Sequence, residues 1–431
     1  MNYYSLNHKA PLSSFKNAVV KGLAPDKGLY FPENFKPLSK DFFLEIDSIS
    51  NSEIAFEAIK QFVQPEIPPD VLKTIIEATL SFKFPVKKID TNISVLELFH
   101  GPTMAFKDVG ARFMARCLGY FNRNNTEEVT VLVATSGDTG GAVANGFLGV
   151  KGVHVVILYP SGKVSSIQEK QLTTLGQNIT ALEVDGAFDD CQDMVKHAFL
   201  DEDLTSKMQL TSANSINVAR WLPQMFYFLF AYKQLYKLHK TIVFSVPSGN
   251  FGNICAGMMA QQLGMPVKHF VAANNKNNVV EEYLHTKRYH SKPSIATISN
   301  AMDVGNPSNF IRIQEIYKHH FELLKDNLSA YSFTDEETKA AMKELYKNYN
   351  YMADPHGAVG YLGCKAFLKE HKNAHCVFLE TAHPVKFLDV VETVIPGQQS
   401  LPDQIKSIIN KTKHSIKIKS YDDLKSFLLN R

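Results

Sequence analysis

The sequence lacks the features that mark exported proteins, membrane-spanning proteins and proteins stabilised by disulfides or structural zinc. Its five cysteines are widely scattered over 431 residues and form no C-x-x-C pair, which argues against a disulfide framework or a structural zinc site. The first residues have neither the basic nor the apolar region of a secretory signal, so we expect a cytoplasmic protein. The most apolar segment, 221–232, contains a proline and is shorter than the ~20 residues that a membrane span needs.

An excess of charge of one sign is also missing. The 46 basic and 43 acidic residues leave a net charge of +3, too small to gather nucleic acid or anionic lipid. We therefore expect neither a nucleic-acid nor a membrane partner. The segment 406–425 is rich in lysines interleaved with isoleucines, and a strand or helix with a solvated lysine face is favoured there over an anion-binding tail.

The composition that is present predicts an ordinary globular α/β protein. Hydrophobic residues make up 45% and charged residues 21% of the chain, and its length predicts two or three domains. Residues 1–95 show little strand character beyond an early turn-rich stretch, and their apolar spacing favours short helices. Beyond them, β-branched runs alternate with amphipathic stretches, which is typical of a largely parallel sheet. These runs are 129–134, 153–158, 179–184, 241–246, 267–272 and 376–380.

A glycine-containing loop, SGNFGN at 248–253, joins the predicted strand 241–246 to a helix-like stretch. A strand, a glycine loop and a helix start together favour anion binding, because glycine permits close approach and the helix start offers unpaired N–H groups. The loop has neither a Walker A nor a dinucleotide-binding pattern. From the local sequence, an ordinary tight turn and a phosphate cradle are about equally favoured.

A second loop of this kind, TSGDTGG at 135–141, follows the predicted strand 129–134. Its hydroxyls and helix-start amides suit a carboxylate, although Asp138 is equally well explained as a plain N-cap. Two such loops indicate a site for two anionic groups, such as a phosphorylated cofactor and an amino-acid carboxylate.

Lys107 lies where the predicted strand 93–98 passes into a helical pattern at 106–120. Most lysines are solvated, and a surface position is the default interpretation. Lys107 is surrounded in sequence by Met104, Phe106 and Val109, and a partly desolvated lysine can act as an amine nucleophile. For the nearby His100, a structural turn is favoured over an acid or base role.

Two further polar segments are candidates for binding an anion. Lys163 lies in the segment 160–168, and Asn214, Asn217 and Arg220 are spaced to follow one helical face with Ser215 at its edge. Arg220 is able to clamp a phosphate through its planar fork. From the local sequence, an N-cap followed by a solvated arginine is favoured. His383, before a proline, has no metal partner at ligand spacing and is favoured as structural.

With these segments in hand, the chain resembles the threonine synthase family of fold type II pyridoxal-phosphate enzymes, over roughly residues 1–395. Seven motifs stand in family order: GLYFP at 28–32, HGPTMAFKD at 100–108, TSGDTG at 135–140, NSINVAR at 214–220, SGNFGN at 248–253, SNAMDVGNPSN at 299–309 and ETAHP at 380–384. The resemblance implies an N-terminal subdomain at 1–95, a smaller α/β lobe at 96–225 and a larger lobe at 226–431, each lobe with an open, mostly parallel sheet.

The resemblance also implies pyridoxal 5'-phosphate as cofactor. Lys107 then binds the cofactor as a Schiff base and moves protons, and Thr381 faces the pyridine nitrogen with a neutral hydroxyl. The residues implied for the cofactor phosphate are Gly249, Asn250, Phe251, Gly252 and Asn253.

The implied substrate is O-phospho-L-homoserine, which a threonine synthase converts with water to L-threonine and phosphate. The residues implied for its carboxylate are Ser136, Gly137, Asp138 and Thr139, and those implied for its phosphate are Lys163, Asn214, Ser215 and Arg220. Val218 stands where the family motif commonly has an aromatic residue, which leaves the packing around Arg220 open.

Two rival functions follow from the same residues. A dehydratase-like lyase of this fold needs the lysine and the carboxylate loop but no second phosphate site. A non-catalytic relative that binds a phosphorylated ligand does not need Lys107 at all. The sequence leaves open the oligomeric state and whether the polar segment 300–309 is a loop near the site or a structural turn cluster.

Overall fold

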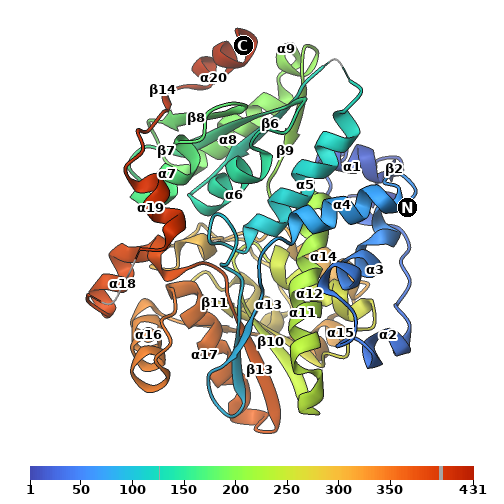
Figure 1. Ribbon diagram of the computed structural model, residues 1–431, viewed down its shortest axis with the longest axis vertical. Helices are drawn as coiled ribbons and strands as arrows, with labels where there is room; N and C mark the ends of the chain where they lie inside the picture. The colour runs from blue at the N-terminus through green and yellow to red at the C-terminus, as the bar shows by residue number, and fades with distance from the viewer. Residues whose placement is uncertain (126, 398–400) are drawn as a thin grey trace. The chain divides into compact units, whose positions relative to one another are not determined.

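The computed structural model describes residues 1–125, 127–397 and 401–431, and it shows an α/β fold with mostly parallel sheets (Figure 1). The chain forms two compact units. The first unit comprises Met1–Phe31, Lys107–Arg220 and Leu401–Arg431, and the second comprises Pro32–Phe106 and the chain from Trp221 onward to residue 397. The domain boundaries expected from the sequence, at 95 and 225, stay a prediction.

The first unit contains a small three-stranded sheet, β2-β1-β3, and a five-stranded sheet in the order β14-β8-β7-β6-β9. All strands of the larger sheet run parallel. Its elements are β1 Asn2–Ser5, β2 Ser13–Ser14, α1 Phe15–Lys21, β3 Tyr30–Pro32, α5 Lys107–Asn122, β6 Val129–Ala134, α6 Asp138–Phe147, β7 Val153–Pro160, α7 Ser166–Thr173, β8 Ile179–Val184, α8 Phe188–Leu200, α9 Glu202–Thr205, β9 Gln209–Ser212, α10 Val218–Trp221, α19 Asp403–Ile409, β14 Ile416–Ile418 and α20 Tyr421–Leu429.

Helices cover both faces of this five-stranded sheet. Leu132, Val156 and Leu182 lie on one face and pack against apolar residues of α8 and α20. Ile157 points to the other face, because side chains alternate along a strand, and there it approaches the backbone of Gly140 in α6. Burial on both faces explains the nearly continuous apolar runs of the inner strands.

The second unit contains a six-stranded sheet in the order β12-β11-β10-β13-β5-β4, in which only the edge strand β4 is antiparallel. Its elements are α2 Lys40–Leu44, α3 Asn51–Val63, α4 Pro69–Thr79, β4 Val86–Lys88, β5 Ile93–Glu97, η1 Leu222–Gln224, α11 Met225–Leu235, η2 Tyr236–Leu238, β10 Thr241–Pro247, α12 Gly252–Gln262, β11 His269–Asn274, α13 Val279–Thr286, η3 Asn300–Met302, α14 Phe310–Ile316, α15 Phe321–Asn327, β12 Leu328–Ser332, α16 Asp335–Tyr349, α17 Pro355–Glu370, β13 Ala374–Glu380, η4 Pro384–Phe387 and α18 Leu388–Val394.

This sheet is also covered on both faces. Val243 and Phe378 pack with α16, α17 and α18 in one core cluster. On the opposite face, Phe244 and Phe270 surround Phe228 of α11, with ring centroids 5.0 and 5.9 Å from that ring. The sheet is therefore held between two helical layers, and in open α/β sheets of this kind ligands bind at the loops beyond the carboxyl ends of the strands.

The predicted strands are confirmed as inner strands of the two larger sheets, whereas some edge strands were not predicted. The strands 129–134 and 179–184 have the expected bounds, whereas the run 267–272 is displaced to His269–Asn274. The sequence missed β9 and β12, which are short strands at sheet edges with mixed burial. An edge strand lacks the continuous apolar run that reveals an inner strand.

The lysine-rich tail forms both a strand and a helix. In β14 only Ile418 is buried, at 4% exposure, and Lys417 is exposed. All five cysteines are buried. Among the residues that the structure describes, no helix has the length and apolarity of a membrane span, and no group of three potential metal ligands occurs.

We expect His375 to make the second unit sensitive to acid. The ring is 3% exposed and lies 2.9 Å from the Ser94 hydroxyl, and burial together with the charges of Lys240 and Lys88 lowers its pKa to about 4. The unfolded chain then binds the proton more strongly between pH 6.5 and 4, so stability falls as the pH falls through that range. In His375→Gln, the loss of unfolding free energy between pH 7.5 and 5.0 should be smaller by about 1–2 kcal/mol, measured by urea denaturation. An equal loss in both proteins would contradict this assignment.

Candidate active site

The loop 248–253 joins β10 to α12 in the second unit. Phe251, the residue before the helix, has a left-handed backbone with φ of 59°, and its ring packs against Phe310. No side chain caps the helix start, so the first N–H groups of α12 are not satisfied by a capping side chain. Backbone donors and the positive end of an 11-residue helix fit a phosphate dianion.

The polar segment that the sequence left open packs against this loop. Gly249 has no room for a side chain, because an added Cβ would lie 2.7 Å from the Cα of Met302. The carbonyl of Asn250 accepts a hydrogen bond from the Asn309 side chain at 3.1 Å, and the Asn250 side chain accepts one from the Ser308 N–H at 2.6 Å. The segment 299–309 is therefore a hydrogen-bonded support of the predicted phosphate loop.

The lysine-bearing segment is tied to the end of β13. Strands β5 and β13 are parallel neighbours, and the N–H of Phe106 donates to the carbonyl of Thr381 at 2.8 Å. Ala105, which precedes Phe106, and Ala382, which follows Thr381, form an antiparallel bridge. Lys107 follows directly in the chain as the first residue of α5 and is half-buried, so the default interpretation of a solvated surface lysine is wrong.

Two buried carboxyl groups lie side by side beneath these strand ends. Glu97 and Glu380 are register partners of β5 and β13 and are 1% and 0% exposed. Burial raises the pKa of Glu97, but hydrogen bonds from His100 and Lys87 more than offset it and leave the pKa below its ordinary value. Burial and the neighbouring Asp354 raise the pKa of Glu380 well above its ordinary value. The two neighbouring carboxyl groups therefore have pKa values shifted in opposite directions, because Glu97 has cationic hydrogen-bond partners and Glu380 faces another carboxyl group.

The two histidines of this region have structural partners. His100 pairs with Glu97 at 2.8 Å, and the ring nitrogen Nδ1 of His383 accepts from the Val385 N–H at 3.1 Å. Burial lowers the pKa of His383 to about 4, with the His100 charge contributing, so the ring is neutral at pH 7. These contacts agree with the structural roles favoured for both residues.

In the first unit, the loop 135–138 is organised by Thr135. The Thr135 hydroxyl accepts hydrogen bonds from the N–H groups of Gly137 and Gly140 at 2.9 and 2.8 Å. Gly137 and Asp138 are buried, whereas Ser136 and Thr139 are half-buried. The hydroxyls of Ser136 and Thr139 are therefore the groups of this loop best placed to meet a carboxylate, a role that stays a prediction.

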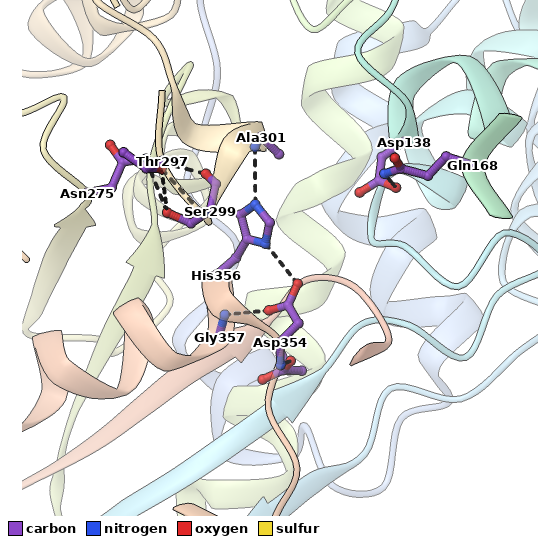
Figure 2. Close-up of polar contacts among 10 residues, drawn as sticks. Asp138, Gln168, Asn275, Thr297, Ser299, Ala301, Asp354, His356 and Gly357 are labelled. Carbon is purple, nitrogen blue, oxygen red and sulfur yellow. Dashed lines mark hydrogen bonds and ion pairs between the residues drawn. The ribbon is translucent and has the colours of Figure 1, made fainter. Parts of the chain in front are cut away.

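Asp138 does not cap the helix, so the alternative that it is a plain N-cap is wrong. It is the first residue of α6, and its Oδ1 accepts from the side-chain amide of Gln168 at 2.9 Å (Figure 2). The Thr135 hydroxyl takes the capping role. Gln168 in turn belongs to the capping box of α7, so the two loops at the ends of β6 and β7 are held together.

We expect Gly137→Ala to destabilise the first unit. Gly137 has a φ of 138°, and an added Cβ would lie 2.5 Å from the Gln168 side chain. The strain and the clash should together lower the free energy of unfolding by about 2–4 kcal/mol. Gly176→Ala is the matched control, since Gly176 has a φ of 65° with no atom within 4 Å. Equal losses for the two variants in urea unfolding would show that the contact with Gln168 is unimportant.

The four residues predicted for the substrate phosphate differ in exposure. Lys163 is exposed in the turn after β7, and Asn214 and Ser215 are half-buried after β9. Arg220 is only 3% exposed, and its guanidinium donates to the Ala213 carbonyl, so the expectation of a solvated arginine is wrong. Because β9, β6 and β7 are parallel neighbours, the loops that carry these residues and the 135–138 loop share one sheet edge.

The expected helical face over 214–220 is also wrong. The helix α10 begins only at Val218, because the side chain of Asn217 turns inward. Its amide donates to the Val19 carbonyl at 2.8 Å, and its oxygen accepts from the Ala219 N–H at 3.0 Å. Asn217 is thus a buried structural residue, and only Asn214, Ser215 and Arg220 remain as candidates from this segment.

Sequence reasoning missed Asp354 and His356, which lie at the start of α17 in the second unit (Figure 2). Both are buried, and they are joined by a 2.8 Å contact between Asp354 Oδ2 and His356 Nδ1. The D-P-H-G pattern at 354–357 does predict a capped helix start. It carries no signal for the second partner of His356, the N–H of Ala301, which lies 55 residues away.

Comparisons with known proteins agree with this geometry. The family model described as "Threonine synthase N terminus" matches residues 2–80, "Pyridoxal-phosphate dependent enzyme" matches 79–381, and "Threonine synthase, C-terminal" matches 357–428. The threonine synthase of Buchnera aphidicola subsp. Acyrthosiphon pisum is 42% identical, with 100% of both chains covered. The chain belongs to the threonine synthase family. All residues predicted for the cofactor and the substrate lie inside the match to the pyridoxal-phosphate enzyme family.

Solved structures of threonine synthases have the same fold over the whole chain. The crystal structure from Escherichia coli has a TM-score of 0.92 at 40% identity and covers 100% of both chains. The structure of PLP-bound threonine synthase from Brucella melitensis has a TM-score of 0.93 at 31% identity and covers 100% of this chain and 99% of that one. The predicted fold class, two mostly parallel sheets of the fold type II kind, is confirmed.

Proposed function

We propose that this chain converts O-phospho-L-homoserine and water to L-threonine and phosphate, with pyridoxal 5'-phosphate as its cofactor. The observation that carries the proposal is the hydrogen bond from Phe106 to Thr381, which ties the lysine-bearing segment to the end of β13. The next strand of the same sheet, β10, ends in the uncapped helix start that fits a phosphate. Membership of the threonine synthase family supports the choice of reaction.

The chain's own residues would divide the chemistry as follows. The bound cofactor supplies an electron sink, which allows protons to leave Cα and then Cβ of the substrate. We propose that the Lys107 amine takes and returns these protons and that Thr381 presents a hydroxyl to the pyridine nitrogen. The Cγ–O bond breaks and releases phosphate, Cγ gains a proton, and water adds its hydroxyl at Cβ.

The substrate anions would be held by the first unit. We propose that Ser136 and Thr139 donate to the carboxylate, with Gly137 and Asp138 shaping the loop. Arg220, Asn214, Ser215 and Lys163 would receive the substrate phosphate. A buried guanidinium is strongly stabilised by an anionic partner, which suits Arg220 for this role.

The test is a product assay on the purified protein supplied with pyridoxal phosphate. Incubation with O-phosphohomoserine should release phosphate and form threonine in equal amounts. Serine and threonine serve as alternative substrates, because a dehydratase converts them to 2-oxo acids. Formation of 2-oxo acids without threonine from O-phosphohomoserine would favour the rival lyase, and a protein that binds cofactor without turnover would favour the binding relative.

The cytoplasmic location and the absence of a nucleic-acid partner stay predictions. Cell fractionation with an antibody to the protein tests the location, and a gel-shift assay tests nucleic-acid binding. Recovery of the protein in the membrane or secreted fraction would contradict the first expectation.

A further inference from the structure

His356 of the second unit links two buried groups through both of its ring nitrogens (Figure 2). Nε2 accepts the N–H of Ala301 at 3.2 Å, and Nδ1 lies 2.8 Å from Asp354 Oδ2. A backbone N–H can only donate, so Nε2 must be unprotonated and the ring proton sits on Nδ1. The ring is therefore a neutral imidazole in one tautomer, donating to Asp354 and accepting from Ala301.

The Asp354 end of this link is anchored at the end of β13. Asp354 is 0% exposed, and its Oδ1 accepts from the Gly357 N–H at 2.7 Å, which caps α17. Its own N–H donates to Oε1 of Glu380 at 2.7 Å. Glu380 is the residue directly before Thr381, the proposed partner of the pyridine nitrogen. The link thus begins at the part of the sheet that the cofactor ring would face.

The Ala301 end of the link lies against the proposed phosphate loop. A Cβ added to Gly249 would lie 2.7 Å from Met302 Cα and 3.1 Å from the Ala301 carbonyl oxygen. The backbone of Gly249 is therefore in contact with the peptide between Ala301 and Met302. A shift of η3 by a few tenths of an ångström must be passed to Gly249, because close-packed groups cannot absorb it.

The residues that flank η3 are held by hydrogen bonds that do not involve His356. The Asp303 carboxylate accepts hydrogen bonds from the Asn275 amide at 2.9 Å and from the Thr297 hydroxyl at 2.7 Å. His356 bonds the middle of the same segment, at Ala301. Loss of His356 would leave the ends of η3 in place and release the part that touches Gly249.

We propose that His356 is a positioning residue for the cofactor phosphate: through Ala301 it holds η3 against Gly249, and through Asp354 it couples this support to the end of β13. The inference rests on the proposed function, since it assigns the cofactor phosphate to the 248–253 loop. His356 does not touch the reacting atoms in this proposal. Its role is to keep the phosphate loop in the shape that binds.

The experiment compares pyridoxal-phosphate affinity with the stability of the cofactor-free protein. We expect His356→Ala to weaken cofactor binding by about tenfold to a hundredfold, which is the effect that losing an outer hydrogen-bonding partner has at metal sites. His356→Gln restores a side-chain acceptor for Ala301 and should recover part of the affinity. The matched control is His375→Ala, since His375 is equally buried, at 3%, but lies at the other end of β13.

Affinity is measured by cofactor absorbance or fluorescence titration, and stability by the thermal midpoint of the cofactor-free proteins. A merely structural role would lower the midpoint in both alanine variants and leave affinity within about twofold of wild type, which would overturn the proposal. If His356→Ala does not fold, His356→Leu decides, because leucine keeps most of the side-chain volume but has no acceptor for the Ala301 N–H, and wild-type affinity in that variant would overturn the proposal. Full threonine formation with an unchanged affinity would refute this inference alone, whereas a wild-type protein that binds no cofactor would refute the proposed function as well.

Discussion

Lys107→Ala is expected to lose at least about a thousandfold in kcat/KM for threonine formation from O-phosphohomoserine. The variant lacks the amine that would bind the cofactor covalently and transfer the Cα and Cβ protons. Lys107 is the first residue of α5, and the preceding segment 99–106 contains no lysine that could take its place. Single-turnover measurement of phosphate release separates this loss from slow product release.

Lys107→Arg is the matched control for charge. Arginine keeps a positive charge but stays protonated, so it cannot serve as a nucleophile or base. Both variants should lose the visible absorbance band of protein-bound cofactor and should lose activity together. Substantial threonine formation by Lys107→Arg would show that the lysine acts through its charge alone, and the proposed role would then be wrong.

Arg220→Ala is expected to lower kcat/KM for O-phosphohomoserine by about a hundredfold to a thousandfold, because truncation of a buried charged partner costs several kcal/mol. The affinity for pyridoxal phosphate should be unchanged, since Arg220 is proposed to bind the substrate. Arg220→Lys should recover only part of the loss, because an ammonium lacks the planar fork. Lys163→Ala should cost about tenfold or less, because an exposed charge is screened by water and salt.

A structural role of Arg220 makes a different prediction. Arg220 packs against Gly110, where an added Cβ would lie 2.6 Å from the Arg220 carbonyl oxygen, so its truncation also disturbs α5. Inhibition by inorganic phosphate distinguishes the two roles: it should weaken in Arg220→Ala if the guanidinium binds phosphate. Turnover of O-phosphohomoserine at the wild-type rate would exclude Arg220 from the substrate site and strengthen the dehydratase alternative.

Secondary structure was predicted correctly where a pattern of neighbouring residues determines it. The inner strands β6 and β8 are buried on both faces, so their apolar runs are continuous and their ends are visible in the sequence. The glycine loops after β6 and β10 were found because strand, loop and helix follow one another within a few residues. The edge strands β9 and β12 were missed because an edge strand has only one neighbouring strand and is partly exposed, so its sequence lacks a continuous apolar run.

Side-chain environments were predicted less well. Arg220 was expected to be solvated and is buried. Asp138 was equally well explained as the N-cap of a helix, but the Thr135 hydroxyl caps that helix instead. Asn217 was placed on a helical face and is a buried structural residue. Each of these outcomes depends on a contact with a residue that spacing along the chain does not reveal.

The sequence by itself determined the strand-loop-helix units, the position of Lys107 at a helix start and the order of seven family motifs, because each is encoded in neighbouring residues. Only the tertiary structure decided that the pKa of Glu380 is raised while that of Glu97 is lowered, since that difference arises from burial and from partners that lie far apart in the sequence. It also decided that His356 supports the loop at Gly249 through Ala301. Such contacts join groups far apart in the chain, and they exist only once the sheet has ordered its strands.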